Sequence, residues 1–170
     1  DVPVQTESTV TATVEEDDLA NAQSTGNDED GSLTSSTDKT VAIGNVSSLV
    51  SVGADEEATF SLSTANMVNP DLLSKGEAVK YEVSADGLTL TAYVENGTNG
   101  QYDAGTDRAV FTLELNGTNN SDYTFTLLDQ LDHASLDGQT GDDTENSLAI
   151  DLSSFVVATD YDGDSITVDN

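Results

Sequence analysis

Alternation of apolar and polar residues is the main pattern along this chain, and it predicts short β-strands instead of helices. The alternation is clearest in residues 88–94, 109–115 and 123–128. No apolar pattern of helical period continues for three turns. The side chains expected to face the core from these three segments are Leu88, Leu90, Ala92, Val94, Phe111, Leu113, Leu115, Tyr123, Phe125 and Leu127.

Shorter segments repeat the pattern and are separated by turn-forming residues. Asn116-Gly117 is a strong signal for a β-hairpin, and Leu72 and Leu73 could begin a short helical turn. The further expected strands are residues 10–14, 40–43, 49–52, 59–62, 80–83, 147–151, 155–158 and 166–168. About 8–10 short strands predict an all-β fold, an Ig-like or cadherin-like antiparallel β-sandwich. We expect residues 1–11 to be a leading segment and residues 12–170 to form one domain.

Composition changes this picture chiefly through charge. The chain has 33 acidic residues and four basic ones, so its formal net charge is −29. Self-repulsion of this size opposes compaction, disfavours nucleic acids and anionic membranes as partners, and favours divalent cations. Disorder and a salt-adapted acidic surface are alternative interpretations; the strand pattern argues against disorder, and a salt-adapted surface is compatible with cation binding.

The chain contains no cysteine, which excludes disulfides and thiolate metal sites. No apolar stretch is long enough to span a membrane. We find no signal peptide, which agrees with a mature fragment, an excised domain, or export through a distant C-terminal signal.

Candidate chemistry is concentrated in the segment Thr159-Asp160-Tyr161-Asp162-Gly163-Asp164-Ser165, between two expected strands. Carboxylates at alternate positions can offer several oxygen ligands to one hard cation, so we predict calcium binding by Asp160, Asp162 and Asp164. The spacing differs from an EF-hand, because Gly163 is the fourth loop residue and no Glu stands at the twelfth position. A solvated polar turn is the alternative.

Two other acidic runs lie in the N-terminal part. Residues 15–18 are four consecutive acids, of which Glu15 and Asp17 could serve a calcium ion at a junction between domains. Residues 27–31 lie within a long polar loop and offer Asp28 and Asp30 for a second cation site.

Three segments, residues 110–115, 123–133 and 158–164, resemble the repeat domains of giant type I secreted RTX biofilm adhesins of Gram-negative bacteria. The most specific part is Tyr123-Thr124-Phe125-Thr126-Leu127 followed by Leu131-Asp132-His133. Residues 14–19 and 52–55 are also similar to this family, so the resemblance covers most of residues 12–169. The glycine-rich nonapeptide repeats of RTX tails are absent from the chain.

The resemblance implies a calcium-stabilised extender or scaffold domain, extracellular at the bacterial surface, that projects or supports ligand-binding modules. It implies calcium as cofactor, with Asp160, Asp162 and Asp164 as ligands and with Glu15 and Asp17 near the same or a neighbouring junction. The partners implied are neighbouring domains of the same adhesin, and glycans or peptides through an adjacent or inserted module. We expect a monomer, with no nucleic acid or membrane partner.

Two other function classes stay open. An enzyme could use Asp129, Asp132, Asp137 and His133, but carboxylates near a single histidine are unsurprising in so acidic a chain, and we expect no catalysis. A calcium-dependent carbohydrate- or peptide-binding module could use the loops 95–107 and 129–145, with Tyr102 and Tyr161 as the available aromatic residues.

Overall fold

The computed structural model describes residues 2–16, 18–19, 39–54, 57–133 and 148–169. Its strands are β1 (Val4–Gln5), β2 (Val41–Asn45), β3 (Val50–Ser51), β4 (Thr59–Leu62), β5 (Leu73–Ser74), β6 (Glu77–Ala78), β7 (Lys80–Val83), β8 (Thr89–Val94), β9 (Arg108–Asn116), β10 (Asp122–Leu127), β11 (Val156–Thr159) and β12 (Ser165–Thr167). The helices in the described residues are three single 3-10 turns, Ser47–Leu49, Thr118–Asn120 and Ser153–Phe155. None of them is long and apolar enough to cross a membrane.

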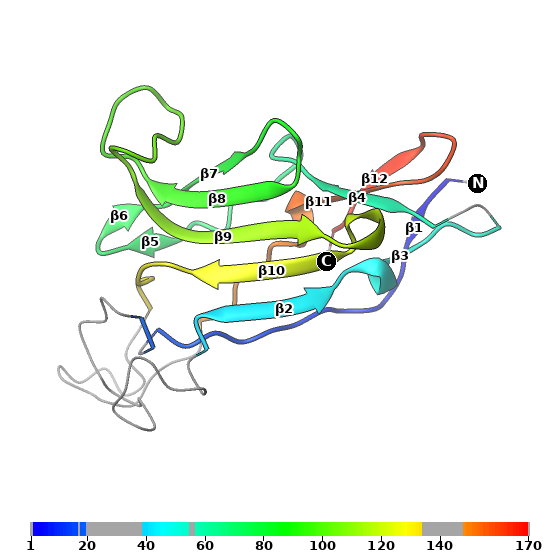
Figure 1. The fold of residues 1–170 in the computed structure, drawn as a ribbon, viewed down its shortest axis with the longest axis horizontal. Helices are drawn as coiled ribbons and strands as arrows, with labels where there is room; N and C mark the ends of the chain where they lie inside the picture. Colours follow the sequence, from blue (N-terminus) through cyan, green and yellow to red (C-terminus); the bar gives the residue numbers. More distant parts are fainter. Residues whose placement is uncertain (1, 17, 20–38, 55–56, 134–147, 170) are drawn as a thin grey trace.

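The described strands form antiparallel sheets (Figure 1). The largest sheet has five strands in the order β2-β10-β9-β8-β7. A three-stranded sheet, β12-β11-β4, and two short ribbons, β1-β3 and β5-β6, complete the described part of the fold. The predicted all-β class is therefore confirmed.

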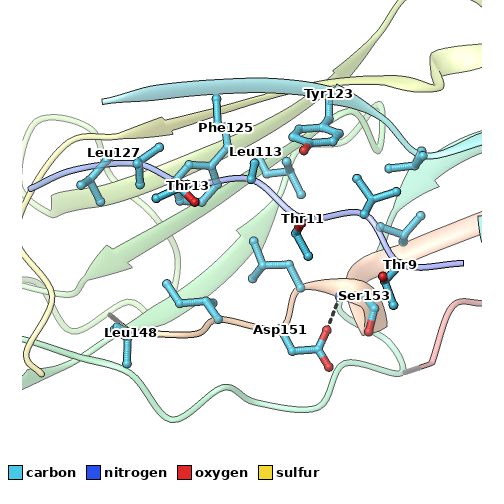
Figure 2. A pocket seen from close by; sticks show the side chains of 18 of the residues that line it. Thr9, Thr11, Thr13, Leu113, Tyr123, Phe125, Leu127, Leu148, Asp151 and Ser153 are labelled. Carbon is cyan, nitrogen blue, oxygen red and sulfur yellow. Dashed lines mark hydrogen bonds between the residues drawn. The ribbon is translucent and has the colours of Figure 1, made fainter. Parts of the chain in front are cut away.

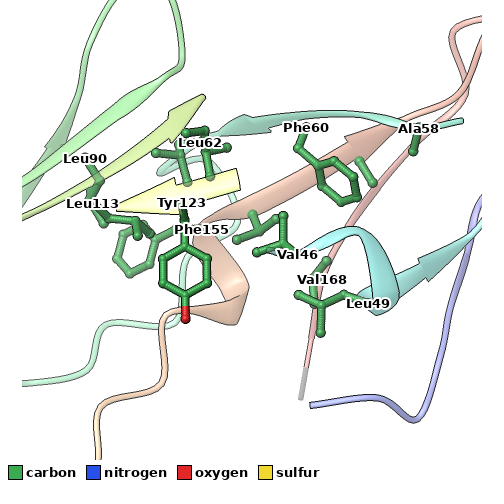
Figure 3. Packing of buried hydrophobic residues seen from close by; sticks show 13 residues of the cluster. Val46, Leu49, Ala58, Phe60, Leu62, Leu90, Leu113, Tyr123, Phe155 and Val168 are labelled. Atoms are coloured by element: carbon green, nitrogen blue, oxygen red, sulfur yellow. The ribbon is translucent and has the colours of Figure 1, made fainter. Parts of the chain in front are cut away.

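The core joins the two larger sheets. Phe60 and Leu62 of β4 and Ala158 of β11 pack in one cluster with Leu90 of β8 and Leu113 of β9 (Figure 3). A second cluster lies further along the five-stranded sheet and includes the fully buried Ala92, Val110 and Phe111. Aliphatic residues dominate both clusters, as the composition predicts, while aromatic rings link them: Tyr81 lies 5.2 Å from Phe155 and 6.4 Å from Phe111, between ring centroids.

A glycine on the edge strand β2 makes room for an aromatic side chain of the first cluster. Gly44 of β2 is paired with Tyr123 of β10, and a Cβ atom at position 44 would lie 2.5 Å from the tyrosine ring. The ring thus covers the glycine across the strand pair. A side chain at position 44 would force Tyr123 out of its buried place.

A bulge in β9 fixes the start of the segment that carries the buried Asp129. Ala92 is paired with Phe111 and Tyr93 with Ala109, so Val110 is the extra residue of the pair β8–β9. The Val110 carbonyl accepts the amides of Leu128 and Asp129, at 2.8 and 3.0 Å. The bulge therefore fixes where the chain leaves β10.

Most of the strongly alternating segments form strands close to their predicted bounds, and the Asn116-Gly117 hairpin joins β9 to β10. Three expectations are wrong. Residues 10–14 and, in their described part, 147–151 form no strand, because no neighbouring strand pairs with them. Leu73 belongs to β5 instead of a helical turn, because Lys75 and Gly76, both with positive φ, close a two-stranded ribbon with β6.

The two ends of the described chain are joined. Within the predicted leading segment, Val4 and Gln5 pair with β3. The Gln5 side chain then mimics a strand neighbour for the C-terminal segment: its Nε2 donates to the Asp169 carbonyl, and its Oε1 accepts the Asp169 amide. The first and last described segments therefore lie side by side.

Gly44→Ala should lower the free energy of unfolding by about 1–3 kcal/mol, because the added methyl group overpacks the site that Tyr123 fills. Gly105→Ala is the matched control: its Cβ would meet a side-chain oxygen at an ordinary 3.6 Å, and its effect should be near zero or slightly stabilising. Urea unfolding of both variants checks this. Equal stability of the two variants would contradict the packing of Tyr123 on Gly44.

Candidate metal centre

The three aspartates of the 159–165 segment come together in the turn between β11 and β12. One carboxylate oxygen from each of Asp160, Asp162 and Asp164 lies within 4.8 Å of the other two. Gly163 makes this turn possible, since its φ of +98° is a backbone conformation that residues with a Cβ rarely adopt. The Thr159 and Ser165 hydroxyl oxygens lie 2.8 Å apart and close the base of the loop.

Asp160 is the residue that organises this loop. Its Oδ1 accepts the amides of Gly163 and Asp164, at 3.0 and 2.8 Å, and its own amide donates to the Asp164 carbonyl. Asp160 is only 6% exposed. Its other oxygen, Oδ2, is buried and has no hydrogen-bond partner. A buried carboxylate oxygen without a partner is costly, so the loop carries a position that a cation or a shared proton would satisfy.

The electrostatics of the loop agree with such a position. Burial opposes the charge on Asp160, but the adjacent Asp162 carboxyl group and the amides of Asp164 and Gly163 outweigh it and lower the pKa of Asp160. The pKa of Asp162 is raised, because its carboxyl group lies against that of Asp160 and is repelled by the Asp160 and Asp164 carboxylates. At neutral pH the loop therefore holds like charges that a cation would bridge.

The donor set is that of a hard cation. Only carboxylate oxygens converge here, and calcium prefers oxygen ligands in flexible arrangements of six to eight. Asp162 and Asp164 are exposed, so water could complete the coordination. The residues present thus fit a metal ion, with calcium favoured by their chemistry.

The other predicted ligands do not join this group in the described residues. The side chain of Glu15 forms an ion pair with Lys39, at 3.1 Å, and its segment lies at the opposite end of the long axis from the β11–β12 turn (Figure 1). Asp17, Asp28 and Asp30 lie outside the described residues.

The carboxylates weighed for catalysis have structural partners. Asp129 is 3% exposed and pairs with Arg108 and Lys75, at 2.8 and 2.7 Å. Burial opposes its charge, but hydrogen bonds from Lys75, the Gln130 amide and Arg108 lower its pKa. Asp132 accepts the amides of Lys75 and Gly76.

The one histidine has an acidic neighbour as well. His133 Nε2 lies 3.3 Å from a Glu16 carboxylate oxygen. Asp137 lies outside the described residues.

The loop 95–107 is organised from within by Asp107, a residue that the sequence did not single out. Asp107 accepts the amides of Asn96, Gly97 and Asp103. The Asp103 amide is the main cause of its lowered pKa. Tyr102 packs on Tyr93, with ring centroids 5.3 Å apart. Tyr161, between Asp160 and Asp162, is 79% exposed.

Comparison of the chain with protein-family models, with curated proteins and with solved structures found no match. The functional argument therefore depends on the residues themselves.

The raised pKa of Asp162 gives a pH-dependent prediction. A raised pKa means that the folded protein favours the protonated form of Asp162. The stability that this protonation contributes is fully present below the ordinary pKa of 3.8 and is lost as the pH rises through the raised pKa of the folded protein. In metal-free buffer Asp162→Asn should therefore raise the Tm at pH 7, and this gain should disappear in acid. Glu114→Gln, an equal charge change at an exposed position of β9, is the control. The same pH profile in both variants would contradict local repulsion in the loop.

Proposed function

We propose that Asp160, Asp162 and Asp164 bind calcium, and that the chain is a calcium-stabilised structural domain of a large secreted bacterial adhesin. The observation that carries the metal site is the buried, unpartnered Oδ2 of Asp160 among converging carboxylates. The adhesin assignment rests on the resemblance of residues 110–115, 123–133 and 158–164, and an Ig-like sandwich belongs to the same proposal.

Calcium would act by removing repulsion from the β11–β12 turn. The paired strands β11 and β4 carry core residues such as Phe60 and Ala158, so a fixed turn stabilises the packing between the sheets. A single site at a calcium concentration about a hundredfold above its Kd adds about 2.7 kcal/mol. Against a total stability of roughly 5–15 kcal/mol, this is a substantial share.

In this proposal the domain works outside the cell, where calcium modules with a Kd of about 10⁻⁴–10⁻³ M are loaded. Its partners are neighbouring domains of the same adhesin, and no catalysis is involved. The high negative charge keeps the domain soluble and away from other anionic surfaces.

A second candidate function is a ligand-binding module of the same type of adhesin. The contact between Gln5 and Asp169 favours it, because domains whose ends lie together are readily inserted into, or attached beside, another domain.

Calcium should raise the Tm of the wild-type protein, and chelation should lower it, with half of the effect reached at a calcium concentration of about 0.1–1 mM. Asp160→Asn should abolish most of this shift: it can keep the oxygen that accepts the amides of Gly163 and Asp164 but removes the charge. Differential scanning calorimetry with calcium, magnesium or chelator measures the effect.

Glu114→Gln is again the matched control, and it should retain the full calcium-induced shift. Equal melting curves of the wild-type protein in calcium and in chelator would refute the metal site. A full shift in Asp160→Asn would place the bound ion elsewhere.

A further inference from the structure

A cavity of about 810 Å³ lies between the five-stranded sheet and two segments that cross its inner face. Leu113, Tyr123, Phe125 and Leu127 contribute its apolar floor from β9 and β10 (Figure 2). Residues 9–16, Leu148 and residues 150–153 line it on the other side. The volume falls within the range of about 300–1,000 Å³ that is usual for ligand sites.

The cavity exists because the opposite layer is incomplete. The sheet β12-β11-β4 covers the first core cluster, but β2 and the adjoining part of β10 face segments that belong to no sheet. Among the described residues, no hydrogen bond involves the backbone of residues 9–14 or of residues 148–151. Figure 2 shows the N-terminal segment, which carries Thr9, Thr11 and Thr13, running beside the sheet without forming a strand.

Unpaired amides and carbonyls along an extended segment are a template for another strand. A peptide that pairs with such an edge gains main-chain hydrogen bonds, and its alternate side chains enter the pocket below. Here the row of unpaired groups borders an apolar cavity, so both requirements of strand addition meet at one place. A compact ligand would fill the cavity but leave the backbone groups unpaired.

Charge selects among extended peptides. The Asp151 carboxylate lines the cavity and accepts the Ser153 amide, and no cationic side chain of the described residues pairs with it. The net charge of −29 adds to the negative potential at this surface. Acidic peptides and fatty-acid carboxylates are therefore disfavoured, and peptides with basic ends are favoured.

We propose that this cavity binds an extended peptide segment of a partner protein, with alternate apolar side chains and basic residues at its ends, by pairing with residues 9–14. Six residues in strand conformation span about 20 Å. A peptide of this length would place about three side chains over Leu113, Tyr123 and Phe125. This proposal goes beyond the calcium-binding function and does not depend on it.

The first test uses a panel of seven-residue peptides with Lys at both ends, Val, Leu, Ile or Phe at positions two, four and six, and Thr between them. Isothermal titration calorimetry with the whole chain, in calcium and in chelator, should show binding by members of the panel. Isomers with the three apolar residues consecutive, and versions with Glu ends, should bind about tenfold more weakly or worse. Failure of the whole panel in both buffers would overturn the proposal, as would binding of dodecanoate in preference to every peptide.

Two consecutive proline substitutions test the main-chain pairing. Amides of adjacent residues in an extended segment point to opposite sides, so Ala12→Pro and Thr13→Pro each remove one amide that has no backbone partner among the described residues. Both variants should keep the wild-type Tm, and one of them should weaken peptide binding about tenfold while the other leaves it unchanged. Unchanged binding in both, or equal loss in both, would contradict strand pairing.

Filling the cavity gives an independent test. Ala42 lines the cavity from β2, and Ala42→Trp should block peptide binding without lowering the Tm, because the ring enters space already present. Ala104→Trp, at an exposed position of the 95–107 loop, is the control and should bind peptide as the wild-type protein does. Undiminished binding in a folded Ala42→Trp variant would place the peptide elsewhere and overturn the proposal.

Discussion

Hydrogen bonds from main-chain amides to carboxylates are the interaction on which this acidic fold depends. The four basic side chains are all engaged in ion pairs: Lys39 with Glu15, Lys75 with Asp129, Lys80 with Glu95, and Arg108 with Asp129 and Glu77. Because basic side chains are so few, acidic side chains accept hydrogen bonds from main-chain amides instead. The residues that accept main-chain amides include Glu82, Asp86, Glu95, Asp103, Asp107, Asp132, Asp151 and Asp160.

This interaction explains why acids occur beside Gly and Asn in the loops. An amide can reach a carboxylate of its own loop only where the chain turns sharply, and successive amides in such turns form concave sites for anions. Asp107 receives three amides in this way and holds the 95–107 loop together. Asp160 does the same with two amides, but its second oxygen is left without a partner, and this difference separates the β11–β12 turn from the other acidic turns of the described residues.

Alternation along the chain was sufficient to predict β8, β9 and β10, because each of these strands carries buried side chains and has a neighbouring strand on both sides. The same pattern misled us for residues 10–14: Val10 and Val14 do pack on the core, but pairing depends on a neighbouring strand that local sequence does not encode. The bulge at Val110 was also missed, since one unpaired residue leaves an apolar run unchanged.

The candidate metal site could likewise be predicted only in part. Proximity in sequence brought Asp160, Asp162 and Asp164 together as expected, since all three lie in one turn. Glu15 lies far along the chain, and only tertiary structure could place it with Lys39 instead of with the loop. The local sequence pattern also could not predict that Asp129 is buried, because its partners Lys75 and Arg108 are distant in the sequence.

The side-chain amide of Gln5 has a mechanical consequence. It holds the last described residues to the first strand by two hydrogen bonds at Asp169. A force that pulls these two segments apart would load the two hydrogen bonds at Asp169 one after the other, instead of shearing many bonds at once. These two bonds would therefore bear the load before the strands of the five-stranded sheet do.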